Sequence, residues 1–287
     1  MTAIYERELR SYFNGMTAYV FVAFLLLFAG IYTMLYNLNN GYPNFEYVLQ
    51  SMTIIFLIAI PILTMRVIAE ERRQKTDQLL YALPVGMTRV VLGKYLALLT
   101  VVALPCAIMV LYPVLLSTFG AVSFRTAYGA LAGFLLLSAA LAAIGLLISS
   151  LTENQAVAAG LCFAVMLLLY FMGDLSSFVP SSASASLGAL IIAVAALAGA
   201  VRLLTRSTPA ALAVAIVGEG GLLAGYVAAP DAFTGLFGRV MDGLSVFERF
   251  YTFADGVFDL SAALYLLTII GVCLFLSVQS MEKRRWS

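Results

Sequence analysis

Long apolar runs constrain this chain more than any other feature. About eight segments of some twenty nearly uncharged residues follow one another, at roughly 17–37, 47–67, 94–119, 127–150, 154–173, 185–204, 208–229 and 260–281. A helix needs about twenty apolar residues to cross the hydrocarbon of a bilayer. With 63% hydrophobic and 11% charged residues, the chain cannot cover itself with polar surface as a soluble domain does. The sequence predicts an all-α, polytopic helical membrane protein.

The number of spans depends on two of these segments. Segments 185–204 and 208–229 are rich in Ala and Gly and only weakly hydrophobic. If both cross the bilayer there are about eight spans, and if neither does there are six. Either number leaves the two termini on the same side of the membrane.

The positive charges predict which side that is. With the N-terminus inside, thirteen of the sixteen Lys and Arg residues fall on the inner side, and only Arg125, Arg239 and Arg249 fall outside. Loops that remain in the cytoplasm carry such an excess of Lys and Arg. We therefore expect both termini in the cytoplasm.

Residues 1–15 have the pattern of an interfacial amphipathic helix that precedes a permease domain at 16–287. Apolar side chains gather on one helical arc and charged ones on the opposite arc, although Glu8 lies inside the apolar arc. The alternative is a simple charged lead-in to the first span.

Motifs for catalysis are missing. The sequence has no histidine, no phosphate-binding loop, no dinucleotide-binding glycine pattern and no nucleophile elbow. Its three cysteines lie far apart in apolar runs. We expect no catalytic residues, no metal site and no cofactor in this chain. The net charge of +1 gives no indication of nucleic-acid binding.

Glu219 is the one ionisable residue deep inside an expected span. A charge at the bilayer centre costs about 2.5–3.5 kcal/mol on insertion scales, so this carboxyl must be protonated, paired or turned toward a polar cavity. It is either a proton or substrate site, or a carboxyl hydrogen-bonded to a neighbouring helix that Gly218, Gly220 and Gly221 allow to approach.

The outer segment 230–259 is too polar to span the membrane. Its aromatic residues recur at helical spacing, which predicts a short amphipathic helix at the outer interface carrying Phe247, Phe250, Tyr251 and Phe258. The alternative is an aromatic belt that only anchors the last span.

The cytoplasmic loop at 66–94 is the most charged part of the chain. Thr76 can cap a short helix on which Leu79, Leu80 and Leu83 share one face, and Pro84 ends it. A solvated loop is the simpler interpretation. However, an exposed stripe of leucines indicates a docking partner.

Three stretches carry a resemblance to a known family. They are AEERRQKTDQLLYALPV after the second span, ISSLTENQAVAA between the fourth and fifth spans, and FERFYTFADGVFDL before a final span that ends in MEKRRW. In this order the chain resembles the membrane-spanning subunits of type-2 ABC exporters, especially gliding-motility permeases. That family usually has six spans, so the pair at 185–229 is a departure.

The resemblance implies a permease subunit in a bacterial inner membrane. It would pair with a second permease, identical or different, and with two copies of a separate ATPase subunit that binds ATP and Mg. In the family the loop after span two contacts the ATPase. Here that role falls on Glu70, Glu71, Arg72, Arg73, Lys75, Thr76, Leu79, Leu80, Leu83 and Pro84.

Two rival functions remain open on the sequence. One is a secondary transporter driven by an ion gradient, with Glu219 as the coupling residue. The other is a membrane scaffold or sensor that transports nothing, which the short external loops disfavour because they leave little surface outside the membrane.

Overall fold

The computed structural model describes residues 2–76, 86–205 and 208–285, and the regular elements in these ranges are all helices. The chain forms two compact units. Unit 1 comprises residues 1–167 and 246–287, and unit 2 comprises residues 168–245. The fold is therefore all-α, as the apolar runs predict.

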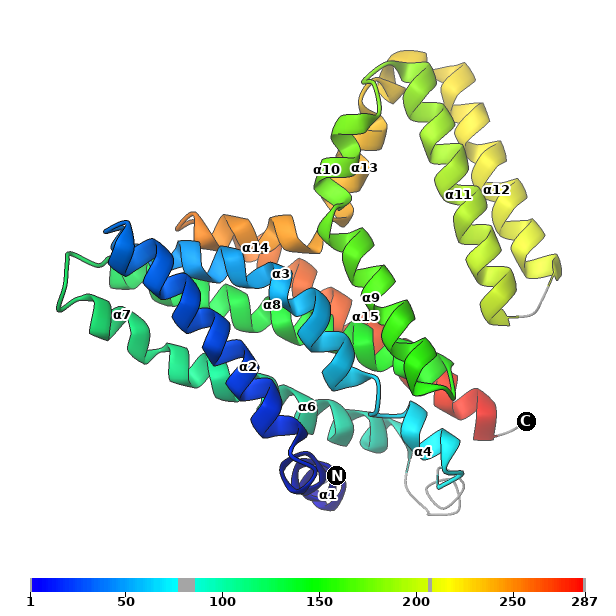
Figure 1. Ribbon diagram of the computed structural model, residues 1–287. Helices are drawn as coiled ribbons and strands as arrows, with labels where there is room; N and C mark the ends of the chain where they lie inside the picture. The colour runs from blue at the N-terminus through cyan, green and yellow to red at the C-terminus, as the bar shows by residue number, and fades with distance from the viewer. Residues whose placement is uncertain (1, 77–85, 206–207, 286–287) are drawn as a thin grey trace. The chain divides into compact units, whose positions relative to one another are not determined.

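Unit 1 is a bundle of long helices with shorter ones at both ends (Figure 1). Its elements are α1 (Thr2–Asn14), α2 (Thr17–Tyr32) continued by the π-helix η1 (Thr33–Asn39), α3 (Glu46–Thr64), α4 (Ala69–Arg73), α6 (Met87–Met109), α7 (Leu111–Leu116), α8 (Phe124–Leu151), α14 (Val246–Ala254) and α15 (Leu260–Arg285). Helix α9 (Gln155–Tyr170) leads from unit 1 into unit 2.

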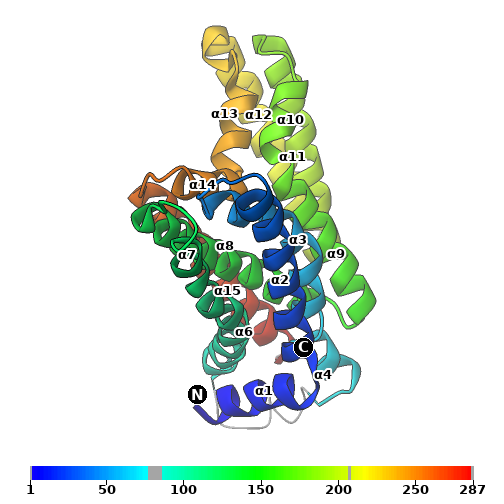
Figure 2. The ribbon, with the colours of Figure 1, turned by 60° about the vertical axis from the view of Figure 1, so that its left-hand side comes forward.

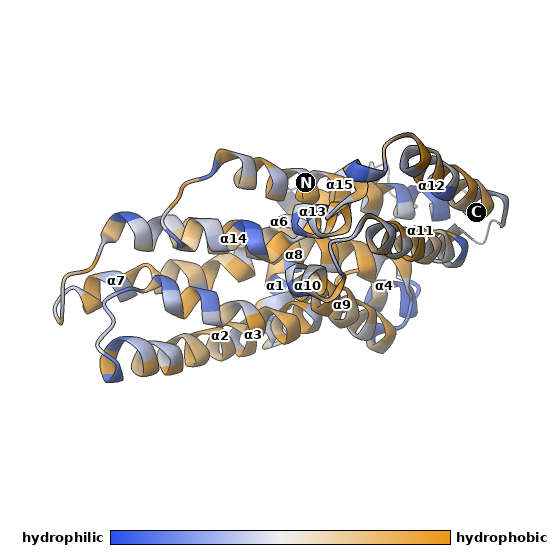
Figure 3. Cartoon of the chain, turned by 90° about the horizontal axis from the view of Figure 1, so that it is seen from above, coloured by the Kyte–Doolittle hydropathy of each residue, from blue (hydrophilic) through white to orange (hydrophobic). Residues whose placement is uncertain are grey.

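Six helical stretches of the described chain are long and apolar enough to cross a membrane. They are Thr17–Asn39, Glu46–Arg73, Met87–Leu116, Phe124–Leu151, Ala211–Ala228 and Leu260–Arg284. The other two expected segments correspond to the apolar helix Gln155–Tyr170 and to the apolar stretch Ala183–Gly199, which is the first part of a helix that runs to Thr205. Figure 3 shows how orange, apolar residues dominate the long helices while α4 is blue. The expected segment at 154–173 is not one continuous helix, because α9 ends at Tyr170 and a new helix begins at Met172.

Helix α8 forms the centre of unit 1, where it packs against α3, α6, α14 and α15. Small residues let its neighbours approach closely. A Cβ added at Gly133 would lie 2.7 Å from Phe253 Cβ, and one added at Gly145 would overlap the side chain of Thr64. The Ala- and Gly-rich sequence of α8 thus permits the close packing of the bundle.

Unit 2 contains α10 (Met172–Phe178), α11 (Ala183–Thr205), α12 (Thr208–Ala228), η2 (Pro230–Phe233) and α13 (Leu236–Leu244). Helices α11 and α12 lie side by side (Figure 1). They approach closely at Gly218, where an added Cβ would lie 2.6 Å from Val194 Cγ1. The weakly hydrophobic pair of segments therefore forms a helical hairpin.

The outer segment contains α14, but this helix is shorter than the aromatic spacing predicts. Phe247 and Phe250 are 1% and 0% exposed, and Tyr251 is half-buried with its hydroxyl 3.3 Å from that of Thr53. The helix ends at Ala254 because Gly256 adopts a φ of +82°. The placement of Phe258 on this helix was wrong, since Phe258 follows the turn and is 71% exposed.

Candidate functional site

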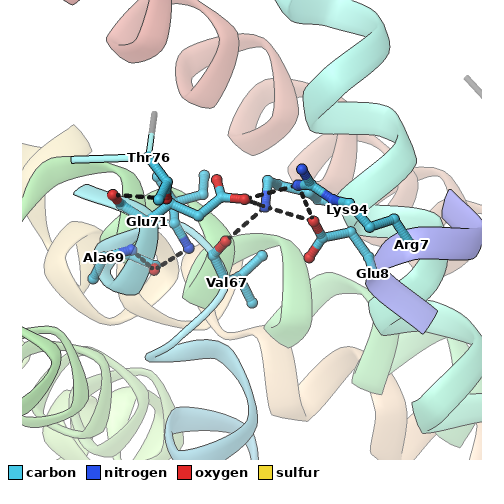
Figure 4. A network of polar contacts seen from close by, with 9 residues as sticks. Arg7, Glu8, Val67, Ala69, Glu71, Thr76 and Lys94 are labelled. Carbon is cyan, nitrogen blue, oxygen red and sulfur yellow. Dashed lines mark hydrogen bonds and ion pairs between the residues drawn. The ribbon is translucent and has the colours of Figure 1, made fainter. Parts of the chain in front are cut away.

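A buried lysine organises the end of unit 1 at which α1 and α4 lie. The ammonium of Lys94, near the start of α6, donates to the Val67 carbonyl oxygen at 3.0 Å and to Glu8 Oε1 at 3.1 Å (Figure 4). It also lies 2.9 Å from Glu71 Oε1, and the lysine side chain has no exposed surface. Removing an ammonium from water costs several kcal/mol unless its partners are well placed. These three contacts join α1, the end of α3 and α4 to α6.

Arg7 connects the same two carboxylates from the rim of the cluster. Its guanidinium lies 2.6 Å from Glu8 Oε1 and 2.9 Å from Glu71 Oε1, with about half of the side chain exposed. The hydrogen bond to Glu8 raises the pKa of Arg7 above its usual value, against the opposing effect of burial. Two cations and two carboxylates thus form a neutral cluster of charges.

A break in the second long helix provides the Val67 carbonyl oxygen, which is the third acceptor of the Lys94 ammonium. Helix α3 ends at Thr64, and α4 begins only at Ala69. Ser149 Oγ of α8 accepts the backbone N–H groups of Ile68 and Ala69, both at 3.1 Å. It therefore satisfies donors that a new helix leaves without intrahelical partners. The Val67 carbonyl in the break is available to Lys94.

The C-terminal end of α15 lies at the same end of unit 1. Ser280 Oγ donates to the Ser150 carbonyl at 3.0 Å, next to the Ser149 that holds the break. Arg284 forms an exposed ion pair with Glu153 at 2.6 Å. Figure 2 shows α1 lying across this end of the bundle, close to α4. Both terminal helices therefore lie at the end of unit 1 that contains the helical break and the charge cluster.

The structure places the predicted coupling residues in three environments. Glu70 is half-buried on α4, and Arg73, Lys75 and Thr76 are exposed. Glu71 and Arg72 point into unit 1, as described below. The last four residues, Leu79, Leu80, Leu83 and Pro84, lie outside the described residues.

Arg72 and Glu71 are turned into unit 1, and their predicted contact with a partner protein stays a prediction. Arg72 is only 4% exposed, and Glu71 is engaged by Lys94 and Arg7. A five-residue helix over Ala69–Arg73 turns its side chains in different directions. Arg73 and Lys75 remain available at the surface.

Sequence reasoning did not find Glu8, Lys94 and Ser149. For Glu8, the sequence offers one indication of this contact, which is its position within the apolar arc of residues 1–15. A carboxylate on the packed face of a helix needs a cation as its partner. In the sequence, Lys94 is one of several positive residues of the 66–94 loop. Nothing in the local sequence distinguishes Ser149 from its neighbour Ser150.

Glu219 lies half-buried on α12, inside the candidate span Ala211–Ala228. Its carboxyl group forms no hydrogen bond or ion pair with the residues that the structure describes. Gly218 provides the close helix approach that was expected, whereas a Cβ at Gly220 or Gly221 would meet nothing within 4 Å. Both sequence interpretations of Glu219 remain predictions.

Across the described ranges, no three or more His, Cys, Asp or Glu side chains are grouped so that they could hold a metal ion. The arrangement offers charge pairing and helix capping rather than bond-making chemistry. Fold and site together define a polytopic helical membrane protein with a tightly connected polar junction at one end of its spans.

Comparison with known families identifies the protein further. The model of the family described as "ABC-2 family transporter protein" matches residues 29–278, and the chain belongs to this family. It is thus a multi-pass permease component of an ABC transporter, a family whose permeases act with an ATPase subunit in a lipid membrane. No curated protein matches the chain in sequence.

Proposed function

We propose that this chain is the permease subunit of a bacterial inner-membrane exporter whose conformational cycle is driven by ATP hydrolysis on a separate subunit. Two copies of that ATPase would bind ATP and Mg, and a second permease, identical or different, would complete the substrate pathway. A nearer relationship to gliding-motility permeases stays a prediction.

The observation that supports ATPase coupling is the Lys94 cluster. Its contacts tie α4 to α1, to the end of α3 and to α6 through one buried ammonium. A force applied to the 66–94 loop by a partner would therefore act on the second and third long helices together. Packed elements joined in this way move as rigid bodies rather than deforming continuously.

The exposed cations give the loop a surface for that partner. Arg73 and Lys75 lie at the turn that follows α4. The expected leucine stripe of Leu79, Leu80 and Leu83 follows directly in sequence. Apolar anchors surrounded by charges are the usual composition of a protein interface.

Co-purification with the ATPase and measurement of ATP turnover test this proposal. Replacing Leu79, Leu80 and Leu83 by Asp should abolish both assembly and permease-dependent turnover. Replacing the same three residues by Met keeps their volume and apolarity and should preserve both. Intact assembly and turnover in the Asp variant would show that this loop does not couple the permease to the ATPase.

The secondary-transporter alternative rests on Glu219, a half-buried carboxyl in an apolar helix without a partner among the described residues. Transport in vesicles separates the two functions. An ATP-driven exporter stops when ATP is depleted, whereas an ion-coupled transporter continues and loses activity in Glu219→Gln.

A further inference from the structure

A polar cavity of about 640 Å³ lies beside the charge cluster, where α1, α3 and α4 meet. Its charged lining consists of Arg7, Glu8, Arg66, Glu70 and Glu71. Arg7 already pairs with Glu8 and Glu71. The proposed function assigns no ligand to this space.

An apolar groove of about 320 Å³ continues from the cavity between α2 and α3. The two share Gly15, Thr17, Leu63 and Arg66 in their linings. Phe21, Ala59 and Leu63 are buried lining residues, while Val20, Ile58 and Ile62 are 66%, 50% and 50% exposed. From Thr17 to Phe24 the groove follows α2 for about 10 Å at 1.5 Å per residue. It has the dimensions of part of an acyl chain.

Arg66 stands where the cavity passes into the groove. It is exposed, and its guanidinium forms no hydrogen bond or ion pair with any residue in the described ranges. A guanidinium is suited to phosphate, which it binds through two parallel N–H donors. Arg66 therefore offers an anion site at the boundary between polar and apolar linings.

The carboxylate groups beside Arg66 favour a ligand that also carries N–H donors and a positive charge. Glu70 is half-buried, and within the described chain Glu71 Oε2 has no hydrogen-bond partner. A purely anionic headgroup would bring no donor to these acceptors and would be disfavoured by the Glu70 charge. A primary ammonium has three N–H donors for such acceptors, as the lysine ammonium does, whereas a quaternary ammonium has none.

We propose that this composite site binds one phospholipid with a primary-amine headgroup. Its phosphate lies on Arg66, its ammonium contacts Glu70 and Glu71, and one acyl chain occupies the groove between α2 and α3. Arg66 follows the apolar α3 on the side that the positive charges predict to be cytoplasmic. The lipid belongs to the inner leaflet and lies against the polar junction.

Native mass spectrometry of the full chain, purified and delipidated in detergent, tests this assignment. Phosphatidylethanolamine, phosphatidylcholine and phosphatidylglycerol with identical acyl chains are titrated singly. We expect the ethanolamine lipid to bind about tenfold more tightly than either of the others, the equivalent of one charge-assisted contact. Arg66→Gln should weaken its binding about tenfold, and Arg89→Gln, at an exposed arginine of α6 outside both linings, should leave it unchanged.

A second pair of variants tests the groove. Val20→Trp fills it and should reduce binding of the ethanolamine lipid about tenfold, whereas Leu27→Trp, at an exposed α2 residue outside the lining, should have no effect. Equal binding of all three lipids overturns the proposal, because the site would then bind any bilayer lipid without distinguishing its headgroup. The proposal is also overturned if Val20→Trp leaves lipid binding unchanged but abolishes a permease dimer. That result would show that a second permease, and not a lipid, covers the groove.

Discussion

The Glu8 carboxylate lies 3.1 Å from the buried ammonium of Lys94, although 86 residues separate them in sequence. This contact holds the N-terminal helix against the start of α6. It also explains why a carboxylate interrupts the apolar arc of α1. The junction is therefore built from charges in a place where the pattern of residues 1–15 indicated mainly apolar packing.

Replacing Lys94 by Met should destabilise the protein by about 3 kcal/mol, because the largely buried carboxylates of Glu8 and Glu71 would lose this cation and keep only the half-exposed Arg7. Thermal unfolding in detergent measures the loss. The triple variant Glu8→Gln, Glu71→Gln, Lys94→Met removes the stranded charges and should recover part of it. If Lys94→Met unfolds at the wild-type temperature, the cluster does not hold the junction together.

Ser149→Ala should cost about 1–3 kcal/mol, since it deprives the buried N–H groups of Ile68 and Ala69 of their acceptor. Ser138 is the matched control, being a buried serine of the same helix whose hydroxyl bonds, among the described residues, only to the Leu135 carbonyl. Ser138→Ala should change the unfolding temperature little. Equal effects of the two substitutions would contradict the capping role of Ser149.

Gly145→Ala should destabilise the bundle by about 1–3 kcal/mol, because its Cβ would overlap Thr64 at the contact of α8 with α3. Gly129 belongs to the same helix and has open space around the corresponding position. Gly129→Ala should therefore be neutral or slightly stabilising. Thermal unfolding of the two variants side by side measures the difference, and a harmless Gly145→Ala would argue against the close approach.

Phe250→Ala should cost about 3–5 kcal/mol, because it opens a cavity among side chains of α14 and α8. Phe258→Ala should have little effect on unfolding, since that ring is mostly exposed. The comparison separates a packed outer helix from a purely interfacial aromatic belt. Similar small losses in both variants would favour the belt.

Charge reversal at Arg73 and Lys75 should weaken association with the ATPase about three- to tenfold, with a larger effect at low salt. The reason is that these exposed cations flank the proposed docking segment. Binding assays at two ionic strengths measure the effect, with Arg89→Glu as the control. Unaltered affinity of the double variant would place the interface elsewhere.

The sequence by itself determined that the chain is helical and membrane-spanning, because span length and hydrophobicity are local properties compared with a fixed bilayer thickness. It also indicated α1, α14 and the charged segment around α4. The ends of helices are harder to predict from sequence. The aromatic spacing extends α14 to Phe258, but the helix ends earlier because Gly256 adopts a positive φ.

Only the tertiary structure decided which polar residues are internal. Glu8, Lys94, Ser149 and Arg72 have polar side chains like many at a membrane surface, and their burial depends on which distant helix lies opposite. Lys94 becomes a structural centre because α1, the break after α3 and α4 each bring an acceptor to it. Such convergence arises from packing between segments far apart in the chain, so a local pattern does not contain it.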